Sequence, residues 1–177
     1  MKVLVLCGPE SSGKSWLAER IREQFGAVVV DEYVREFIDA HRRDTCYADI
    51  PAIALGQLQR EDAARSQQPE LLVLDTHLLS NLLWSQTLFG DCPDWLESAL
   101  LQRHYDLHLL LSPEQAPWVA DGQRCQPDLI LRQRFYDASE QWLKQHDQRY
   151  VVIDGDWTAR QAQAMDEVRR LLASQAT

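Results

Sequence analysis

Residues 8–15 read Gly-Pro-Glu-Ser-Ser-Gly-Lys-Ser and match the phosphate-binding loop pattern G-x-x-x-x-G-K-[ST]. The short run of residues 2–7 before this loop suits a buried strand, and residues 16–22 after it suit a helix. In a strand, loop and helix of this kind, backbone N–H groups converge at the positive end of the helix dipole, where they bind a polyphosphate. The feature therefore predicts a nucleoside triphosphate site, and the alternative is a glycine-rich turn that binds no nucleotide.

Five apolar runs recur along the chain, and each is short and continuous rather than alternating. Such runs are typical of strands buried on both faces of a parallel sheet, and they occupy residues 3–7, 27–30, 71–74, 107–111 and 150–153. Helical patterns lie at residues 14–25, 51–67, 78–89, 94–103, 129–146 and 158–173, the last opening with Thr158 and Gln161 as a capping box. The alternation predicts an α/β fold of the P-loop NTPase type, in one domain over residues 1–177. We expect a doubly wound, parallel five-stranded sheet with helices on both faces.

Composition excludes several classes of function. The 177 residues carry a net charge of −9, which disfavours a nucleic acid partner but is compatible with a small phosphorylated one. No apolar run approaches the length that crosses a membrane, and the N-terminus lacks a signal peptide, so we expect a cytoplasmic protein with no membrane partner. The four cysteines form no Cys-x-x-Cys pair and the five histidines form no metal-ligand spacing, so we expect no zinc site.

In a doubly wound sheet, ligands bind beyond the C-terminal ends of the strands, so candidate site residues are sought there. After the first strand, Lys14 is expected to reach the β- and γ-phosphates of ATP, and the Ser15 hydroxyl is expected to bind Mg²⁺. The predicted ATP-binding residues around the loop are Gly8, Glu10, Ser11, Ser12, Gly13, Lys14, Ser15 and Trp16.

Acidic residues follow the second and third strands. Glu32 is a candidate general base, and with Tyr33 and Arg35 it is predicted to contact the substrate; the alternative is a helix cap with surface ion pairs. Asp75 follows four apolar residues, as in a Walker B strand, and is predicted to bind metal and substrate. The alternative for Asp75 is an ordinary cap on a helix that begins near His77.

A segment rich in proline and arginine follows the fourth strand and is predicted to be a lid over about residues 112–134. Lids of this kind exclude water and place arginines against phosphates, so Arg124 is predicted to be catalytic and, with Arg132, to bind ATP. Trp118 in the lid and Trp84 are candidates for stacking on a flat substrate ring, with Trp118 as the predicted substrate contact. The alternative places Arg132 and Arg134 on a solvated helix face, and we prefer that alternative for Arg134. The turn at residues 154–157 is interpreted as a lead into the last helix rather than as a border of the adenine base.

The combination favours a small-molecule kinase over the other P-loop classes. The domain is small, no Asn-Lys-x-Asp guanine motif follows the fourth strand, and a lid with arginines is present. The expected reaction is in-line transfer of the γ-phosphoryl group of ATP with Mg²⁺ as cofactor, in which the protein supplies positioning and positive charge. Lys14, Glu32 and Arg124 are the predicted catalytic residues.

The chain resembles the ribosylnicotinamide kinase domain of the bifunctional bacterial regulators of NAD synthesis. The matching segments run in the family's order and span most of the chain: Gly-Pro-Glu-Ser-Ser-Gly-Lys-Ser at 8–15, Glu-Tyr-Val-Arg-Glu-Phe at 32–37, Tyr-Ala-Asp-Ile-Pro at 47–51, Ala-Leu-Gly-Gln at 54–57, Leu-Asp-Thr at 74–76 and Trp-Val-Ala-Asp-Gly-Gln-Arg at 118–124. One departure is His77, which stands where the resemblance leads us to expect a second acid.

The resemblance implies ATP-dependent phosphorylation of the 5′-hydroxyl of nicotinamide riboside, giving nicotinamide mononucleotide. It also implies that Glu32 and Arg35 line the reacting centre, that Asp75 binds magnesium or substrate, and that Arg124 clamps phosphate. The family usually fuses this domain to others, so the chain is expected to be a stand-alone kinase or one domain of a fusion.

Two other functions remain open: a kinase for another nucleoside or ribosyl compound, and an ATP-dependent switch or sensor. The choice between Glu32 and Asp75 as base, the choice between ATP and GTP as donor, and the oligomeric state also stay open.

Overall fold

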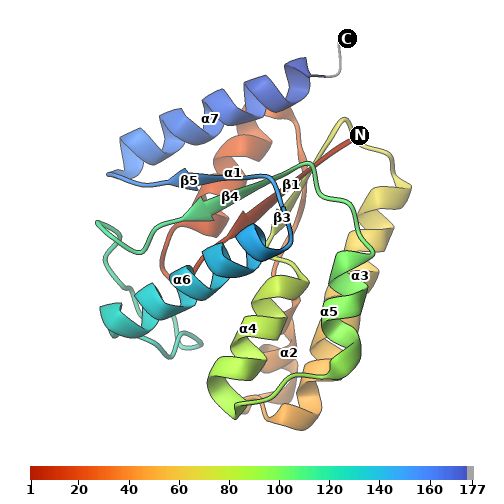
Figure 1. The fold of residues 1–177 in the computed structure, drawn as a ribbon, viewed down its shortest axis with the longest axis vertical. Helices are drawn as coiled ribbons and strands as arrows, with labels where there is room; N and C mark the ends of the chain where they lie inside the picture. The colour runs from red at the N-terminus through yellow and green to blue at the C-terminus, as the bar shows by residue number, and fades with distance from the viewer. Residues whose placement is uncertain (175–177) are drawn as a thin grey trace.

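The computed structural model describes residues 1–174, and its centre is one parallel sheet of five strands (Figure 1). The strands are β1 (Lys2–Cys7), β2 (Val28–Val30), β3 (Leu71–Asp75), β4 (Leu107–Leu111) and β5 (Tyr150–Ile153), in the order β2-β3-β1-β4-β5. Each lies within one residue of the apolar run that predicts it. The predicted α/β fold with a doubly wound five-stranded sheet is therefore confirmed.

The position of β1 in the sheet explains where a ligand can bind. Its neighbours are β3, with Leu4 opposite Val73, and β4, with Leu6 opposite Leu109. The chain reaches β2 and β3 on one side of β1 and then crosses to β4 and β5 on the other side. The C-terminal end of β1, which leads into the phosphate-binding loop, consequently lies at the switch point of the sheet.

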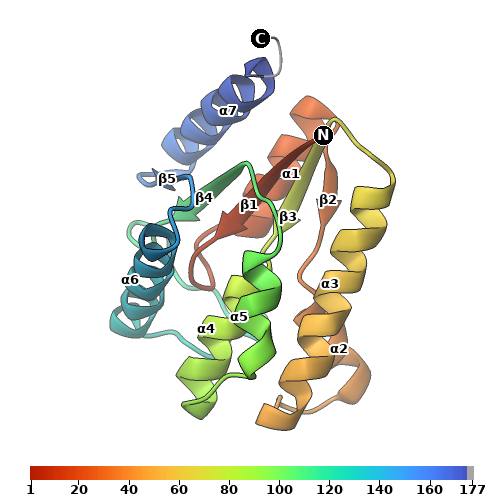
Figure 2. The ribbon, with the colours of Figure 1, turned by 45° about the vertical axis from the view of Figure 1, so that its right-hand side comes forward.

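Helices cover both faces of the sheet (Figure 2). On one face, α1 (Lys14–Phe25) and α7 (Trp157–Ala173) pack against side chains such as Leu4 and Leu109. On the other face, side chains such as Val5 and Leu74 pack against α3 (Ile50–Ser66), α4 (Leu78–Phe89), α5 (Asp94–Leu101) and α6 (Leu129–Gln145). Alternate residues of β1 thus enter two separate cores, which is why the run that forms it is apolar throughout.

The structure differs from the sequence-based prediction in two additional helices and in the cap of the last helix. A nine-residue helix, α2 (Tyr33–His41), and a short 3₁₀ helix, η1 (Tyr47–Asp49), were not predicted. The predicted capping box of Thr158 and Gln161 is wrong, because α7 begins one residue earlier and Asp156 caps it by accepting a hydrogen bond from the Ala159 backbone N–H at 2.8 Å. An aspartate at the N-cap satisfies one of the N–H groups that the first turn of a helix leaves unpaired.

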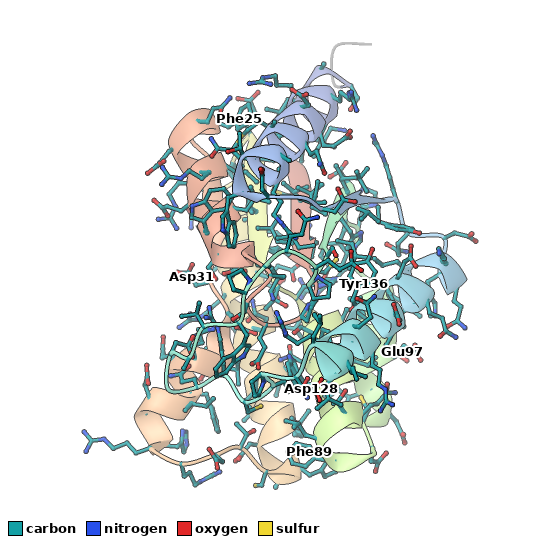
Figure 3. All side chains as sticks on the ribbon, turned by 90° about the vertical axis from the view of Figure 1, so that its left-hand side faces the viewer. Phe25, Asp31, Phe89, Glu97, Asp128 and Tyr136 are labelled. Carbon is teal, nitrogen blue, oxygen red and sulfur yellow. The ribbon has the colours of Figure 1, made fainter. Side chains whose placement is uncertain are left out.

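The connection from β4 to α6 contains no helix or strand over residues 112–128. We call residues 112–128 the lid. In Figure 3 the lid faces the viewer, and Asp128 is labelled at its C-terminal end. The last residues of the predicted lid, 129–134, belong instead to the first turns of α6. Within the described part of the chain, no helix is long and apolar enough to span a membrane.

Candidate active site at the C-terminal edge of the sheet

The phosphate-binding loop is held in shape by contacts to its own carbonyl groups. The Lys14 ammonium donates to the carbonyl oxygens of Gly8 and Pro9 at 2.9 and 2.8 Å, and the Ser12 hydroxyl donates to Pro9 at 2.8 Å. Gly13 has a φ of +94°, and a Cβ there would lie 2.5 Å from the indole of Trp157. Glycine is thus required at position 13 by both conformation and space.

Glu32 lies at the N-cap position of α2 but does not serve as its cap, because its side chain makes no capping hydrogen bond. Its carboxylate instead lies 3.3 Å from the guanidinium Nε of Arg35, one turn further along α2. Burial raises the pKa of the Glu32 carboxyl, and the nearby Asp75 adds to that rise, while Lys14 and Arg35 oppose it. A carboxylate with a raised pKa, held beside the phosphate-binding lysine, suits a proton acceptor.

Asp75 is the last residue of β3 and is buried. Burial raises the pKa of its carboxyl, against the opposing effects of Lys14 and of a hydrogen bond to Ser15. The next residue, Thr76, has a φ of +82°, a strained conformation for a β-branched side chain. The chain thus turns sharply directly after Asp75. The Asp75 carboxylate remains near the phosphate-binding loop, whereas the side chain of His77 enters the core.

His77 is the departure from the expected second acid. It is fully buried, with its ring 4.8 Å from the ring of Tyr105 and 5.2 Å from that of His108. Burial lowers the pKa of both histidines, that of His108 to about 4. His77 therefore belongs to the core beneath the site.

The lid is fastened to the phosphate-binding loop by Glu10. The Glu10 carboxylate accepts hydrogen bonds from the indole N–H of Trp118 at 3.1 Å and from the backbone N–H groups of Cys125, at 3.2 Å, and Gln126. The neighbouring Ser11 hydroxyl accepts a hydrogen bond from a further lid N–H at 3.1 Å. The side chains of two loop residues therefore face the lid, while the loop's backbone remains the phosphate-binding element.

The lid is also fastened to α2, through Asp121. Its carboxylate lies 2.8 Å from Arg35 Nη1 and 3.1 Å from Arg124 Nε. Burial opposes the shift, but hydrogen bonds from Arg35 and from two backbone N–H groups of the lid lower the pKa of Asp121 to about 2. One lid carboxylate thereby holds the arginine beside Glu32 and the arginine predicted to clamp phosphate.

These elements surround a cavity of about 460 Å³, within the size range of small-molecule sites. Ten predicted site residues line it: Glu10, Ser11, Ser12, Gly13, Lys14, Ser15, Trp16, Glu32, Arg35 and Arg124. Trp84, a stacking candidate, also lines it. The end of the cavity formed by Ile50 and Ile53 of α3 and by Asn81, Trp84 and Leu88 of α4 is here called the α3–α4 end.

Five predicted site residues are not in the cavity lining: Gly8, Tyr33, Asp75, Trp118 and Arg132. The Tyr33 ring packs onto Gly56, where a Cβ would lie 2.1 Å from it, so its predicted substrate contact is not seen. Trp118 is turned toward Glu10. Arg132 is buried and donates to the lid carbonyl of Ala116 at 3.2 Å, a position that supports the lid.

The lining also includes residues that the sequence analysis missed or set aside. Trp157, the last residue of the interpreted turn at 154–157 and the first residue of α7, lies against Gly13, with its ring centroid 5.1 Å from that of Trp16. This end of the turn therefore lines the cavity. Asn81 was missed because the Leu-rich pattern of residues 78–89 reads as core; an amide inside that pattern was the available signal. Gln123 and Cys125 enter because the lid folds back over the loop.

Arg160 ties the surroundings of the loop together. This fully buried guanidinium donates to the carbonyl oxygens of Ser12, Ser112, Glu114 and Gly155, at 3.3, 2.9, 2.5 and 2.7 Å. Those groups belong to the phosphate-binding loop, the first residues of the lid and the turn before α7. A single side chain of α7 thus fixes three segments of the site relative to one another.

The comparisons with known proteins agree with this geometry. A family model described as an AAA domain matches residues 3–160. The trifunctional NAD biosynthesis/regulator protein NadR of Salmonella typhimurium is 26% identical over 99% of the chain, and that of Escherichia coli is likewise 26% identical. The chain spans 44% of the length of each of these relatives.

Solved structures share the fold. A crystal structure of NadR protein in complex with NR superposes with a TM-score of 0.78 at 20% identity, over 97% of this chain and 52% of that one. A deoxyadenosine kinase from M. mycoides superposes with a TM-score of 0.69 at 13% identity, over 95% of this chain and 99% of that one. The predicted resemblance to the NadR kinase domain and the P-loop kinase fold are confirmed.

Proposed function

We propose that this chain, which belongs to the AAA-domain family, is an ATP-dependent kinase that phosphorylates the 5′-hydroxyl of nicotinamide riboside to give nicotinamide mononucleotide. The observation that carries the proposal is a single cavity lined by a phosphate-binding loop, by Glu32 and Arg35, by a lid arginine and by an uncharged α3–α4 end. A triphosphate alone would not need the last of these, whereas a second substrate with a flat ring would occupy it.

Each group around the cavity has a role in phosphoryl transfer. Lys14 and Arg124 neutralise charge that develops on the transferred phosphoryl oxygens, and the lid keeps water away from them. Glu32 accepts the proton of the 5′-hydroxyl as that oxygen attacks, with Arg35 orienting the carboxylate. Asp75, the alternative base, is the more deeply buried of the two and lies near Ser15, so we assign it to the metal side of the site.

The residues present fit a magnesium ion. Ser15 supplies a hydroxyl oxygen and Asp75 a buried carboxylate, hard oxygen ligands of the kind that Mg²⁺ accepts together with phosphate oxygens and water. The described residues contain no group of three or more His, Cys, Asp or Glu side chains arranged around one ion. When bound, the ion would neutralise charge on the β- and γ-phosphates.

The comparisons support the choice of acceptor. The relatives are named for NAD biosynthesis, and the structure with the higher TM-score of the two described contains NR. The deoxyadenosine kinase has the same fold, so a nucleoside is the second acceptor to test. We place the reaction in the cytoplasm, with small molecules as its partners.

The decisive experiment offers the protein ATP, Mg²⁺ and a panel of acceptors that includes nicotinamide riboside and deoxyadenosine. Coupled ADP release gives the rate, and mass spectrometry identifies the phosphorylated product. We expect ADP release to depend on nicotinamide riboside and the product to be nicotinamide mononucleotide. ADP release at the same rate without any acceptor would instead support a nucleotide switch, and preferential phosphorylation of deoxyadenosine would support a nucleoside kinase.

Two further variants separate the roles within the site. Lys14→Ala should abolish turnover without unfolding the protein, which circular dichroism checks. Glu32→Gln should lower kcat by about 100-fold or more with ATP affinity little changed, the usual scale of general-base loss. If Glu32→Gln retains normal turnover and Asp75→Asn does not, the base is Asp75.

A further inference from the structure

Asn81 is an unusual residue in its surroundings. It lies within α4, between Ser80 and Leu82, and only 8% of its surface is exposed. Its side-chain Oδ1 is buried and accepts no hydrogen bond from the residues that the structure describes. A buried amide without a partner destabilises a fold, and asparagine is also a poor former of helix interiors, so the position calls for an explanation.

The explanation lies on the side of the cavity. Asn81 lines the α3–α4 end, together with Trp84 one turn later and Leu88 another turn later. The Trp84 ring is steadied from behind by Phe135 of α6, with ring centroids 4.8 Å apart and planes at 37°. An indole fixed in this way and an unpartnered amide therefore stand side by side on one face of α4.

The α3–α4 end is also uncharged, since its lining residues are Ile50, Ile53, Asn81, Trp84 and Leu88. A flat ring would find apolar contacts there, and a positively charged ring would gain from lying over an indole face. A carboxylate on such a ring would lie against lining residues of α3 and α4 that carry no charge, which is costly. A primary carboxamide would have a partner, because an asparagine amide can both donate to it and accept from it.

We propose that Asn81 pairs with the ring carboxamide of the acceptor while Trp84 stacks on the ring, so that Asn81 selects a carboxamide over a carboxylate or an unsubstituted ring. This inference rests on the proposed function and deepens it, because it names the group on the acceptor that is recognised and the residue that recognises it. Asn81 touches the part of the acceptor remote from the reacting hydroxyl, so its effect falls on binding rather than on chemistry.

The test compares three acceptors: nicotinamide riboside, nicotinic acid riboside, and the riboside of unsubstituted pyridinium. In the unmodified protein, we expect kcat/KM for nicotinamide riboside to exceed that for either of the other two by about 10- to 100-fold, the usual worth of one or two buried hydrogen bonds. Asn81→Leu should remove this preference by raising KM for nicotinamide riboside. In the same variant, kcat/KM for the unsubstituted riboside should change by less than about threefold, because that ring has no carboxamide to pair with the Asn81 side chain.

The control is Gln86→Leu, the same amide-to-leucine change on the exposed side of α4 and outside the cavity lining, which should leave all three acceptors unchanged. Equal losses for all three acceptors in Asn81→Leu would mark Asn81 as structural and overturn the inference. The unmodified protein tests it without any variant: if it uses nicotinamide riboside and the unsubstituted riboside equally well, the inference fails while the proposed function stands. If it phosphorylates neither nicotinamide riboside nor the unsubstituted riboside, the inference and the proposed function both fail.

Discussion

Replacing Arg160 with methionine should destabilise the protein more than a typical buried substitution. Methionine retains much of the aliphatic length of the side chain but removes the guanidinium that four backbone carbonyls share. The position is 1% exposed, so water cannot replace the lost donors without the surroundings opening. The four carbonyl groups that remain belong to three different segments of the site.

The magnitude follows from those contacts. A hydrogen bond from a charged donor contributes about 1.5–3 kcal/mol, while removing the charge itself recovers part of its desolvation cost. We therefore expect the free energy of unfolding to fall by about 3–5 kcal/mol, a large part of the about 5–15 kcal/mol typical of a domain. With a urea m value of about 2 kcal/mol/M, the midpoint of unfolding should move down by about 2 M.

Equilibrium urea unfolding followed by circular dichroism measures this shift. The matched control is Arg169→Met on the same helix, because Arg169 is exposed and, among residues 1–174, forms its ion pair with Asp166 three residues earlier, at 2.6 Å. The control should change the free energy of unfolding by less than about 0.5 kcal/mol. If the two variants unfold at the same urea concentration, the view of Arg160 as a shared anchor is refuted.

Three more predictions concern the surroundings of the site. Gly56→Ala places a Cβ 2.1 Å from Tyr33, so it should cost about 1–3 kcal/mol of stability by urea unfolding and, by moving the start of α2, lower kcat; unchanged turnover would show that α2 is not positioned by this contact. Glu10→Gln weakens the charge-assisted bonds that fasten the lid, so limited proteolysis should cut within residues 115–128 several times faster, and an unchanged rate would contradict that role. Burial lowers the pKa of His108 to about 4, below the value of about 6.5 in the unfolded chain, so the unfolded state takes up its proton first as the pH falls. The stability that this group contributes is complete above about pH 6.5 and should be about 2 kcal/mol lower at pH 5. His108→Gln should therefore lose about 2 kcal/mol less than the unmodified protein between these pH values, while the contribution of His77 remains in both.

The strands were predictable because burial on both faces leaves a plain mark on the sequence. Leu107–Leu111 and Tyr150–Ile153 begin and end where the predicted runs do, and His108 is the one polar side chain that either strand carries into the interior. The helix α2 was not predicted because it has only nine residues, and because Glu32 and Arg35 were interpreted as site residues rather than as the start of a helix.

The residues of the site likewise divide into those that could be predicted from the sequence and those that could not. The phosphate-binding loop and the strand-end acids were predictable because the order of the chain dictates their place at one edge of the sheet. Contacts made by the lid were not, because they depend on how an irregular segment folds back: Trp118 turns to Glu10 rather than into the cavity. Asn81 could not be separated from its leucine neighbours until the helix was placed against the cavity.

The fastening of the lid at two points has a consequence for how the two substrates bind. Glu10 holds the lid from the donor side, and Arg35 holds it through Asp121 from the acceptor side. Because one segment is shared, the free energy of closing it enters both binding equilibria. Thermodynamic linkage then requires that, if donor binding favours closure and so tightens acceptor binding by some factor, acceptor binding tightens donor binding by the same factor.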